Sequence, residues 1–459
     1  MKGGRGLLAV VLAALAVVGA GGAARVGPAS PASAAPGDAI SGMWLCPHGG
    51  GPGWTGTIAI ANPATTTVAV RLTSIGSDAS SRPVSVEVPP GREVLQAVTA
   101  GERGSATFVE AFGGWVGVGW QVRAAGDESG MGAEPCAPSG GTTWFTADAT
   151  TVRGQASYLV VMNPFEGEAV FDVTLYQPGR PPARPDDWTG VSLSPHRSIA
   201  LEIAKQVVGR DPVAAQLVVT KGRVAAASLG VSKAGGVRSV LAASALSSTW
   251  YLPVGAGVGQ SSLLVLVPQQ ADAGLNATLL SSQPAQPTAG LTDARQAGQS
   301  TASYDVLSSG AAAVVLHTDG DVPVLAALRS TGRGADGAAT GGTSTPGPAW
   351  LVMPTVAGNP PSPGLVIVNP GEASVDVTLR LLPEGPTDPG EPVTITVPAQ
   401  QALAVPTTFL ARDPKAAVMV SATGSIVALG ASTSEGRHGL SDYGMSVGIP
   451  VPAFGLPGD

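Results

Sequence analysis

The sequence predicts an all-β protein made of four tandem copies of a unit of about 100 residues, each an immunoglobulin-like β-sandwich. Composition is the first reason. The 459 residues include 63 Gly and 40 Pro, and 44 % are hydrophobic while only 12 % are charged and 4 % are aromatic. A sequence rich in Val, Ala, Thr, Ser, Gly and Pro is typical of proteins with short strands separated by turns, and not of helical proteins. The second reason is internal repetition.

Each copy opens with a tryptophan and continues with an apolar run that ends at a proline. The four tryptophans recur at intervals of about 100 residues and are Trp44, Trp144, Trp250 and Trp350. Three of the runs end in Asn-Pro, at Asn62, Asn163 and Asn369, whereas the third copy has Val267 before its proline. We expect the tryptophan to fill the core or the contact between units. We expect the asparagine to cap its own turn and the proline to end the strand.

Two further landmarks follow in every copy. Apolar and polar residues alternate in the next stretch, as expected for a half-buried strand, at residues 68–72, 170–175, 275–279 and 375–379. Near its end each copy has a glycine between two apolar runs, which predicts a terminal hairpin with a tight turn, at Gly113, Gly222, Gly320 and Gly424. About seven short strands per copy fit a two-sheet sandwich.

These landmarks place the copies at residues 41–138, 139–246, 247–346 and 347–459. Residues 331–348 consist largely of Gly, Ala, Thr, Ser and Pro, which indicates a linker or a long surface loop. The segment 448–455 resembles the start of a copy, so it either ends the fourth unit, is shared between neighbouring units, or completes a ring. A closed β-propeller-like ring with two blades per copy is therefore the alternative architecture.

The N-terminal segment, residues 1–40, indicates export. Lys2 and Arg5 precede an apolar run from Leu7 to Ala24, and small residues that suit cleavage follow. This pattern predicts a signal peptide or an uncleaved N-terminal membrane anchor. Cys46 and Cys136 are the only cysteines, and in an exported protein we expect them to form a disulfide. Neither a close Cys pair nor a suitable His pattern accompanies them, so we expect no metal site.

The recurring W-x-x-P start, the L-x-x-x-N-P segment followed by V-x-V-T-L, and the glycine turn together resemble a family of exported actinobacterial proteins of unknown function. The resemblance covers most of residues 41–456, and the third copy departs from it at Val267. It implies an exported protein of similar repeats. It implies no catalytic residue.

Several function classes are excluded or disfavoured by the sequence. The formal net charge of −7 and the lack of a basic run disfavour nucleic-acid binding. The histidines, His48, His196, His317 and His438, occupy a different place in each copy, so no site recurs with the repeat. No nucleophile elbow, zinc-protease motif or phosphate-binding loop is present. We therefore expect a protein without catalytic residues, cofactor or enzymatic activity.

The prediction is a non-enzymatic cell-envelope protein, secreted or anchored by its N-terminal segment, that acts as a scaffold or interaction surface. The alternative is a carbohydrate-binding or assembly-assisting module of the cell-wall machinery. Its contact surface would be in the first copy, at Trp54, Trp115 and Trp120, because a ring beside Gly117 would form a flat platform for stacking. Equally, Trp115 could fill the core above the glycines. Candidate partners are an envelope protein or a cell-wall glycan, and the membrane is contacted only through the N-terminal segment.

Overall fold

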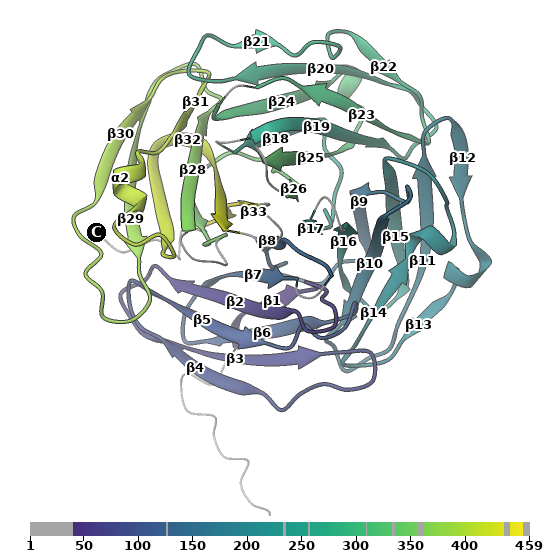
Figure 1. Cartoon of the computed structure of the whole chain (residues 1–459), viewed down its shortest axis with the longest axis horizontal. Helices are drawn as coiled ribbons and strands as arrows, with labels where there is room; N and C mark the ends of the chain where they lie inside the picture. Colours follow the sequence, from purple (N-terminus) through teal and green to yellow (C-terminus); the bar gives the residue numbers. More distant parts are fainter. Residues whose placement is uncertain are drawn as a thin grey trace, which may run out of the picture. The chain divides into compact units, whose positions relative to one another are not determined.

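The computed structural model describes residues 40–124, 127–232, 236–255, 258–308, 310–332, 336–355, 361–435 and 441–452 (Figure 1). The predicted signal peptide or anchor lies outside these residues except for its last position, Ile40. The described part belongs to one compact unit, Ile40–Asp459. It is built almost entirely of antiparallel strands, which confirms the predicted fold class.

We call the first set of strands repeat 1. It comprises β1 (Ile40–Cys46), β2 (Thr55–Asn62), β3 (Val68–Ile75), β4 (Val84–Val88), β5 (Arg92–Val98), β6 (Ala106–Phe112), β7 (Gly117–Arg123) and β8 (Met131–Pro135). These strands form two four-stranded sheets, in the orders β1-β6-β3-β4 and β5-β2-β7-β8. The sheets share one apolar core, to which Trp44, Ile58, Val70 and Val118 contribute. Repeat 1 is therefore a two-layer sandwich, because the chain alternates between two sheets that pack face to face.

Repeats 2 and 3 have the same arrangement. Repeat 2 comprises β9 (Thr143–Ala149), β10 (Gln155–Asn163), β11 (Ala169–Gln177), β12 (Arg180–Ala183), η1 (Asp186–Trp188), β13 (Val191–Leu193), β14 (Arg197–Glu202), η2 (Ile203–Lys205), β15 (Val213–Lys221), β16 (Ala225–Ser232) and β17 (Gly236–Leu241). Repeat 3 comprises β18 (Thr249–Val254), β19 (Val258–Val267), β20 (Ala273–Leu280), β21 (Gln286–Pro287), β22 (Ala294–Gln296), β23 (Ser300–Val306), β24 (Ala312–Thr318), η3 (Asp319–Asp321), β25 (Leu325–Gly332) and β26 (Gly337–Thr340). Each again has two sheets, ordered β12-β11-β15-β9 and β14-β10-β16-β17 in repeat 2, and β18-β24-β20-β21 and β23-β19-β25-β26 in repeat 3.

Repeat 4 differs in that one long strand belongs to both of its layers. It comprises β27 (Gly347–Val352), β28 (Pro361–Asn369), β29 (Val375–Leu382), β30 (Val393–Val397), β31 (Gln401–Ala404), α2 (Thr407–Leu410), β32 (Ala417–Glu435), β33 (Ser441–Val447) and β34 (Ile449–Pro450). The first part of β32 pairs with β27 and β29, and its second part pairs with β28 and β33. Gly424 therefore lies within a continuous strand.

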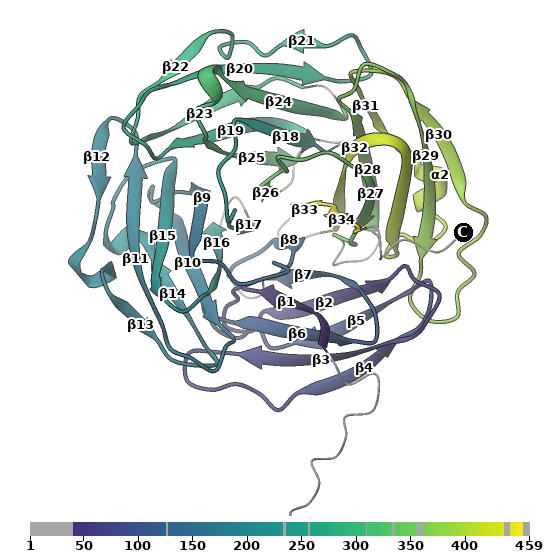
Figure 2. The same ribbon diagram turned by 180° about the vertical axis from the view of Figure 1, so that it is seen from behind.

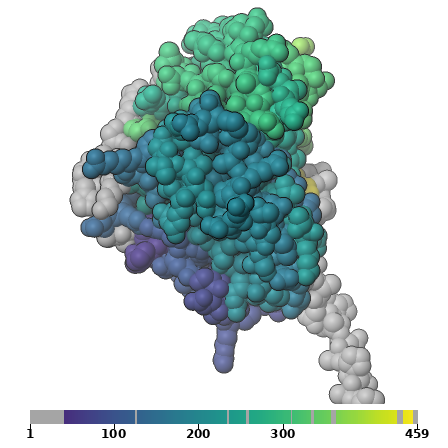
Figure 3. All heavy atoms as spheres, turned by 90° about the vertical axis from the view of Figure 1, so that its right-hand side faces the viewer, coloured from purple at the N-terminus to yellow at the C-terminus, as the bar shows by residue number. Residues whose placement is uncertain are grey.

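The four sandwiches follow one another around a centre (Figures 1 and 2). We call β8, β17, β26 and β33 the inner strands. They contact one another in the cyclic order β8, β17, β26, β33 and back to β8, while β4, β12, β21 and β30 lie at the periphery. Figure 3 shows the outer surface of repeat 2 beside that of repeat 3. The sandwich and the ring, which the sequence left as alternatives, are thus combined: each repeat is a sandwich, and the four close a cycle.

The contact between repeat 4 and repeat 1, which we call the seam, closes this cycle. The backbone N–H of Glu93 donates to Pro383 O at 3.3 Å, and the Ala417 N–H donates to Glu93 Oε2 at 3.0 Å. Arg380 Nη2 donates to Pro63 O at 3.0 Å. Residues more than 300 positions apart are therefore joined by hydrogen bonds.

The C-terminal segment belongs to the end of repeat 4. Ile449 pairs with Leu351 of β27, as Ala137 pairs with Leu45, Ala243 with Phe145, and Thr343 with Tyr251 in the other repeats. Ile449 also enters the core of repeat 1 together with Leu351 and Met353. The segment thus ends its own unit and strengthens the seam.

Two local expectations are corrected. The glycine turns at Gly113, Gly222 and Gly320 have positive φ, as expected, but they do not close hairpins. The strands they join lie in opposite sheets, β6 and β7 in repeat 1 for example, and the hairpin of each repeat is formed one strand later. Residues 331–348 are not a linker, since they contain the inner strand β26. Small residues are needed there because four strands meet closely at the centre.

The repeated tryptophans and asparagines have the structural roles expected for them. The indole N–H groups of Trp144, Trp250 and Trp350 donate to the carbonyls of Val224, Val324 and Ile426, at 2.8–2.9 Å. Each donor is buried in the core of its repeat. These tryptophans therefore fill the cores and are not binding faces.

The asparagines fasten a turn to a neighbouring strand. Asn163 Oδ1 accepts from the Phe165 N–H at 3.1 Å, and its amide nitrogen donates to the carbonyls of Gly167 and Leu193. Asn62 and Asn369 make the corresponding bonds. In repeat 3, where Val267 replaces the asparagine, a buried amide is supplied instead by Gln296 at the end of β22. Its Nε2 donates to Val265 O at 3.0 Å and to Ser300 O at 3.2 Å.

Candidate functional site

The tryptophans predicted to form a binding surface are mostly buried. Trp54 is 6 % exposed and Trp120 is 1 % exposed. Trp120 Nε1 donates to Ser239 Oγ of repeat 2 at 3.1 Å, and Trp54 Nε1 donates to Glu128 Oε2 at 2.9 Å. Both rings pack at the contact between repeats 1 and 2, where a second repeat covers the face that an isolated sandwich would expose. The expectation of an exposed platform is therefore corrected for these two rings.

Trp115 alone of the three is partly exposed. Its ring packs edge-on against Trp44, with centroids 6.1 Å apart and an interplanar angle of 65°. Gly117 faces repeat 4 rather than Trp115, because a Cβ added there would lie 2.3 Å from the Leu351 side chain. The glycine thus serves the seam and not an aromatic platform.

The predicted disulfide between Cys46 and Cys136 is present. Both cysteines are buried, and the bond joins the end of β1 to the residue that follows β8. It therefore fastens the first strand of repeat 1 to its inner strand. A disulfide of this kind indicates an oxidising, extracellular-like environment. Within the described residues, no helix is long and apolar enough to cross a bilayer.

One cluster of buried charge lies where the inner strands begin. One equivalent position, within one residue of the start of each inner strand, is occupied by Gly130, Gly236, Asp336 and Asp442 in repeats 1 to 4. Asp336 is 1 % exposed and Asp442 2 %. The two side chains interact with one another, and Arg123 Nη2 of β7 lies 2.6 Å from Asp442 Oδ2. We call Asp336, Asp442 and Arg123 the axial cluster.

Burial is the main cause that raises the pKa of Asp336 to about 6, and the neighbouring charge of Asp442 acts in the same direction. Arg123 opposes the shift. Two adjacent carboxyls that share a proton are also the arrangement of aspartic proteases. In this protein both carboxyls are almost fully covered, so neither is presented to a substrate. The cluster is therefore suited to binding a proton at the contact of repeats 1, 3 and 4.

A second buried network joins repeats 2 and 3. Asp148 of β9 is 1 % exposed, and its carboxylate lies 3.0 Å from Arg238 Nε and 2.7 Å from Arg329 Nε. Arg329 Nη1 also lies 2.9 Å from Asp211 Oδ1. Although burial acts to raise it, the pKa of Asp148 is lowered, since the two guanidiniums outweigh the loss of solvent. This network is an ionic contact that keeps its charges at neutral pH.

Glu134 of β8 lies across the centre from repeat 3. Its carboxyl faces the Thr340 hydroxyl and the backbone N–H of Gly341, and burial raises its pKa well above the usual range. The side chain is 2 % exposed. Charged and polar groups therefore occupy both ends of the inner strands.

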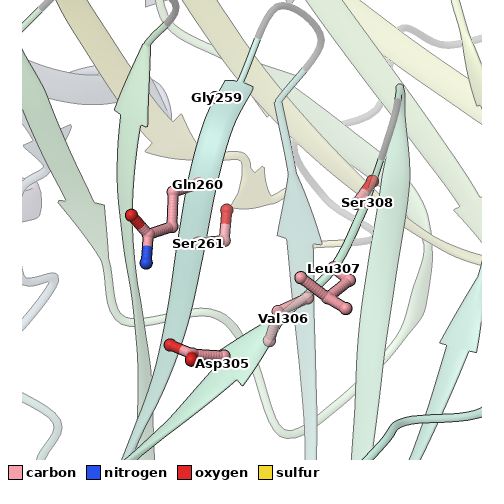
Figure 4. A pocket seen from close by; sticks show the side chains of 7 residues that line it. All are labelled: Gly259, Gln260, Ser261, Asp305, Val306, Leu307 and Ser308. Carbon is pink, nitrogen blue, oxygen red and sulfur yellow. The ribbon is translucent and has the colours of Figure 1, made fainter.

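The surface hollows offer a weaker alternative. One, of about 590 Å³, lies beside the beginning of β19 and the end of β23 and is lined by Gly259, Gln260, Ser261, Asp305, Val306, Leu307 and Ser308. Figure 4 shows these side chains spread along the two strands instead of converging on one point. Two further hollows, of about 500 and 530 Å³, lie beside the ends of β3 and β20. Across the ranges the structure describes, no three His, Cys, Asp or Glu side chains converge to hold a metal ion.

The sequence did not single out Asp336, Asp442, Glu134 or Asp148. Asp336 lies in the stretch expected to be a linker, where a lone acid indicates solvation. Aligning the copies by their inner strands would have revealed the acids, because one register position then holds Gly, Gly, Asp and Asp. The register that allows this alignment comes from the strand pairing and not from the composition.

Comparison with known proteins gives a family but no activity. Residues 110–347 match the model described as "Family of unknown function (DUF5719)", which covers more than half of the chain. No curated protein matches the sequence. A crystal structure titled as a tetra-tandem repeat in the extending region of a large adhesion protein aligns over 85 % of this chain and 93 % of that chain. Its sequence identity is 10 % and its TM-score 0.09, values that give no basis for transferring an arrangement or a function. The matched region spans repeats 2 and 3 together with the end of repeat 1, and the chain therefore belongs to this family of unknown function.

Proposed function

We propose that the protein is an exported, non-enzymatic component of the cell envelope that acts as a scaffold or interaction surface. The observation that carries this proposal is the closed cycle of four repeats, in which the last contacts the first through Glu93 and Ala417. Such closure holds the peripheral strands of four units in a fixed order. It suits a protein that presents surfaces to partners.

The buried charges support the same proposal. Asp148, Asp336 and Glu134 are each covered by neighbouring repeats, so their role is to join repeats rather than to act on a substrate. A glycan-binding module would instead need exposed rings for stacking, and of the three candidate tryptophans only Trp115 is partly exposed. Scaffolding is therefore the function that the geometry favours.

Export is the finer part of the proposal. It rests on the basic and apolar character of residues 1–40 and on the disulfide. Either cleavage of a signal peptide or retention of an N-terminal anchor is compatible with it. Mass spectrometry of the N-terminus of the protein from its native cell envelope distinguishes the two, and recovery of the full chain only from the cytoplasm would contradict export.

The scaffold is tested by photo-crosslinking in intact cells. A photoreactive residue replaces Ser85 of the peripheral strand β4 or Thr378 of β29, the strand that pairs with the peripheral strand β30. Both residues are exposed, and the buried Ala227 serves as the matched control. We expect discrete crosslinks to envelope components from the two exposed positions only. Turnover of an envelope polymer or peptide by the purified full chain, lost on Asp336→Asn with the fold retained, would instead show an enzyme.

A further inference from the structure

The seam has a chemistry that the equivalent contacts between other repeats lack. Glu93, Ser198 and Ala402 are each the second residue of their strand, in β5, β14 and β31. Each donates its backbone N–H to a carbonyl of the neighbouring repeat, Pro383, Gly76 and Ser281 respectively, at 3.1–3.3 Å. The three contacts are therefore equivalent. At the seam, however, the side chain is a carboxyl instead of a hydroxyl or a methyl.

Glu93 has little to stabilise a negative charge. It is 1 % exposed, and one carboxylate oxygen accepts the Ala417 N–H while Oε1 has no hydrogen-bond partner among the described residues. The charged groups that act on it from repeat 4 are Asp413, which follows α2, and Glu384, which follows β29. Burial is the main cause that raises its pKa well above the usual range, and both acids add to the shift.

The axial cluster adds a second group of the same kind at this contact. Asp336 faces Asp442 from β33 and Arg123 from β7, while Gly130 of β8 and Gly236 of β17 present no side chain to it. Among the described residues, the charged groups that act on Asp336 are thus one carboxyl and one guanidinium. Ionisation of Asp336 places its charge beside that of Asp442, away from solvent.

We propose that the seam is a pH-sensitive closure, held by the protonated forms of Glu93 and of the Asp336–Asp442 pair and loosened when these carboxyls ionise. The closed form then binds more protons than an opened form, in which the same carboxyls are solvated. Linkage requires the stability of the seam to be greatest in acid. It falls as the pH rises from the ordinary carboxyl range, about 4, through about 6.

Two other charged contacts respond differently, and Glu134, whose pKa burial also raises, faces Thr340 and Gly341 of repeat 3 and not the seam. The pKa of Asp148 is lowered by Arg238 and Arg329, so the contact between repeats 2 and 3 keeps its strength over this range. His48, near the contact between repeats 1 and 2, has a pKa lowered to about 4 by burial. That contact is therefore weakened in acid, the opposite direction. The Ala402 amide, at the contact between repeats 3 and 4, is the reference for Glu93, because it occupies the equivalent strand position but carries a methyl group instead of a carboxyl.

Hydrogen exchange of the full chain tests the proposal. Protection factors, corrected for the intrinsic rate at each pH, are measured for the amides of Glu93 and Ala417 at the seam and of Ala402 as reference. Between about pH 4.5 and pH 7.5 we expect seam protection to fall about tenfold or more relative to Ala402. Seam and reference amides that change in parallel would overturn the proposal.

Two variants separate the contributions of Glu93 and Asp336 to the pH dependence of the seam. Glu93→Gln and Asp336→Asn imitate the protonated forms, and each should reduce the pH dependence of the seam. Glu93→Gln should leave Ala402 unchanged, whereas Asp336→Asn should also alter Ala402, because Asp336 and Asp442 join repeats 3 and 4. Asp305→Asn, at an exposed carboxyl of β23, is the matched control and should have no effect. Variants that retain the wild-type pH dependence would refute the assignment. Should a variant fail to fold, the pH series of the wild-type chain still decides.

Discussion

Asp336 occupies the space that Gly236 leaves open on the facing inner strand. A Cβ atom added at Gly236 would lie 2.5 Å from Asp336 Cβ, and one added at Gly130 would lie 2.8 Å from Asp336 Oδ2. The same register position thus holds glycine in repeats 1 and 2 and aspartate in repeats 3 and 4. Four strands can meet at the centre because two of them bring no side chain.

Gly236→Ala should therefore destabilise the protein by two separable effects. Gly236 has φ +77°, which costs an alanine about 1 kcal/mol, and the steric conflict with Asp336 adds about 1–3 kcal/mol. Gly154→Ala is the matched control, since Gly154 has φ +86° but nothing within 4 Å of an added Cβ. Urea unfolding measures the loss of unfolding free energy in each of the two variants. Equal losses for the two variants would show that no steric conflict exists.

Asp148→Asn should be among the most damaging single changes. It leaves the guanidiniums of Arg238 and Arg329 without their buried anion, which costs about 3–5 kcal/mol. Because the pKa of Asp148 is lowered in the folded state, its contribution is present at neutral pH and is lost as the pH falls below the ordinary carboxyl range. Asp272→Asn removes an exposed partner of Arg295 and should have a much smaller effect in the same urea titration. Equal losses of unfolding free energy in Asp148→Asn and Asp272→Asn would show that burial does not strengthen the Asp148 contact.

Removal of the disulfide by Cys46→Ala together with Cys136→Ala should lower stability by about 4–5 kcal/mol, because the bond spans 90 residues of the unfolded chain. Wild-type protein unfolded in the presence of a reductant should show a loss of the same size. A loss below about 1 kcal/mol would mean that the unfolded state is not restricted by the bond.

Asn163 in repeat 2 and Gln296 in repeat 3 each supply a buried side-chain amide, so removing either should lower the free energy of unfolding by a similar amount. Asn163→Ala leaves buried carbonyls of repeat 2 unpaired and should cost about 2–3 kcal/mol, and Gln296→Ala should cost about as much in repeat 3. Asn276→Ala, at a more exposed amide of β20, is the control and should cost less. Thermal or urea unfolding measures these losses. If Gln296→Ala does not lower stability, the Gln296 amide does not compensate for the asparagine that repeat 3 lacks.

His48 should make the folded protein sensitive to acid. Its ring is fully buried, Nδ1 donates to Gly49 O at 2.7 Å, and Nε2 accepts from the Thr107 hydroxyl at 3.0 Å, which is the neutral form. With its pKa lowered to about 4, the unfolded chain binds the proton first, so stability falls as the pH drops from about 6.5 to about 4.

His48→Gln removes this titration. The difference in unfolding free energy between pH 7 and about pH 4.5 should be smaller in the variant by about 2–3 kcal/mol. Identical pH dependence in the two proteins would show that folding does not lower the pKa of His48.

The buried role of the tryptophans shows where sequence reasoning reached its limit. The spacing of Trp144, Trp250 and Trp350 correctly predicted a repeated core residue, because each lies within the sandwich of its own repeat. Trp120 was open to a second interpretation, since the alternation of its strand assigns a face but does not say what covers that face. Ser239, 119 positions later in the chain, covers it.

The sequence by itself determined the fold class, the four repeats, the disulfide and the turn-capping asparagines. These depend on local periodicity and on residues that act within one repeat. Only the tertiary structure decided that the four sandwiches close a cycle, that residues 331–348 contain an inner strand, and that Glu93, Asp148 and Asp336 are buried carboxyls. Burial of a carboxyl depends on the repeat that packs over it, and that partner lies about 100 or more residues away, beyond the reach of any local pattern.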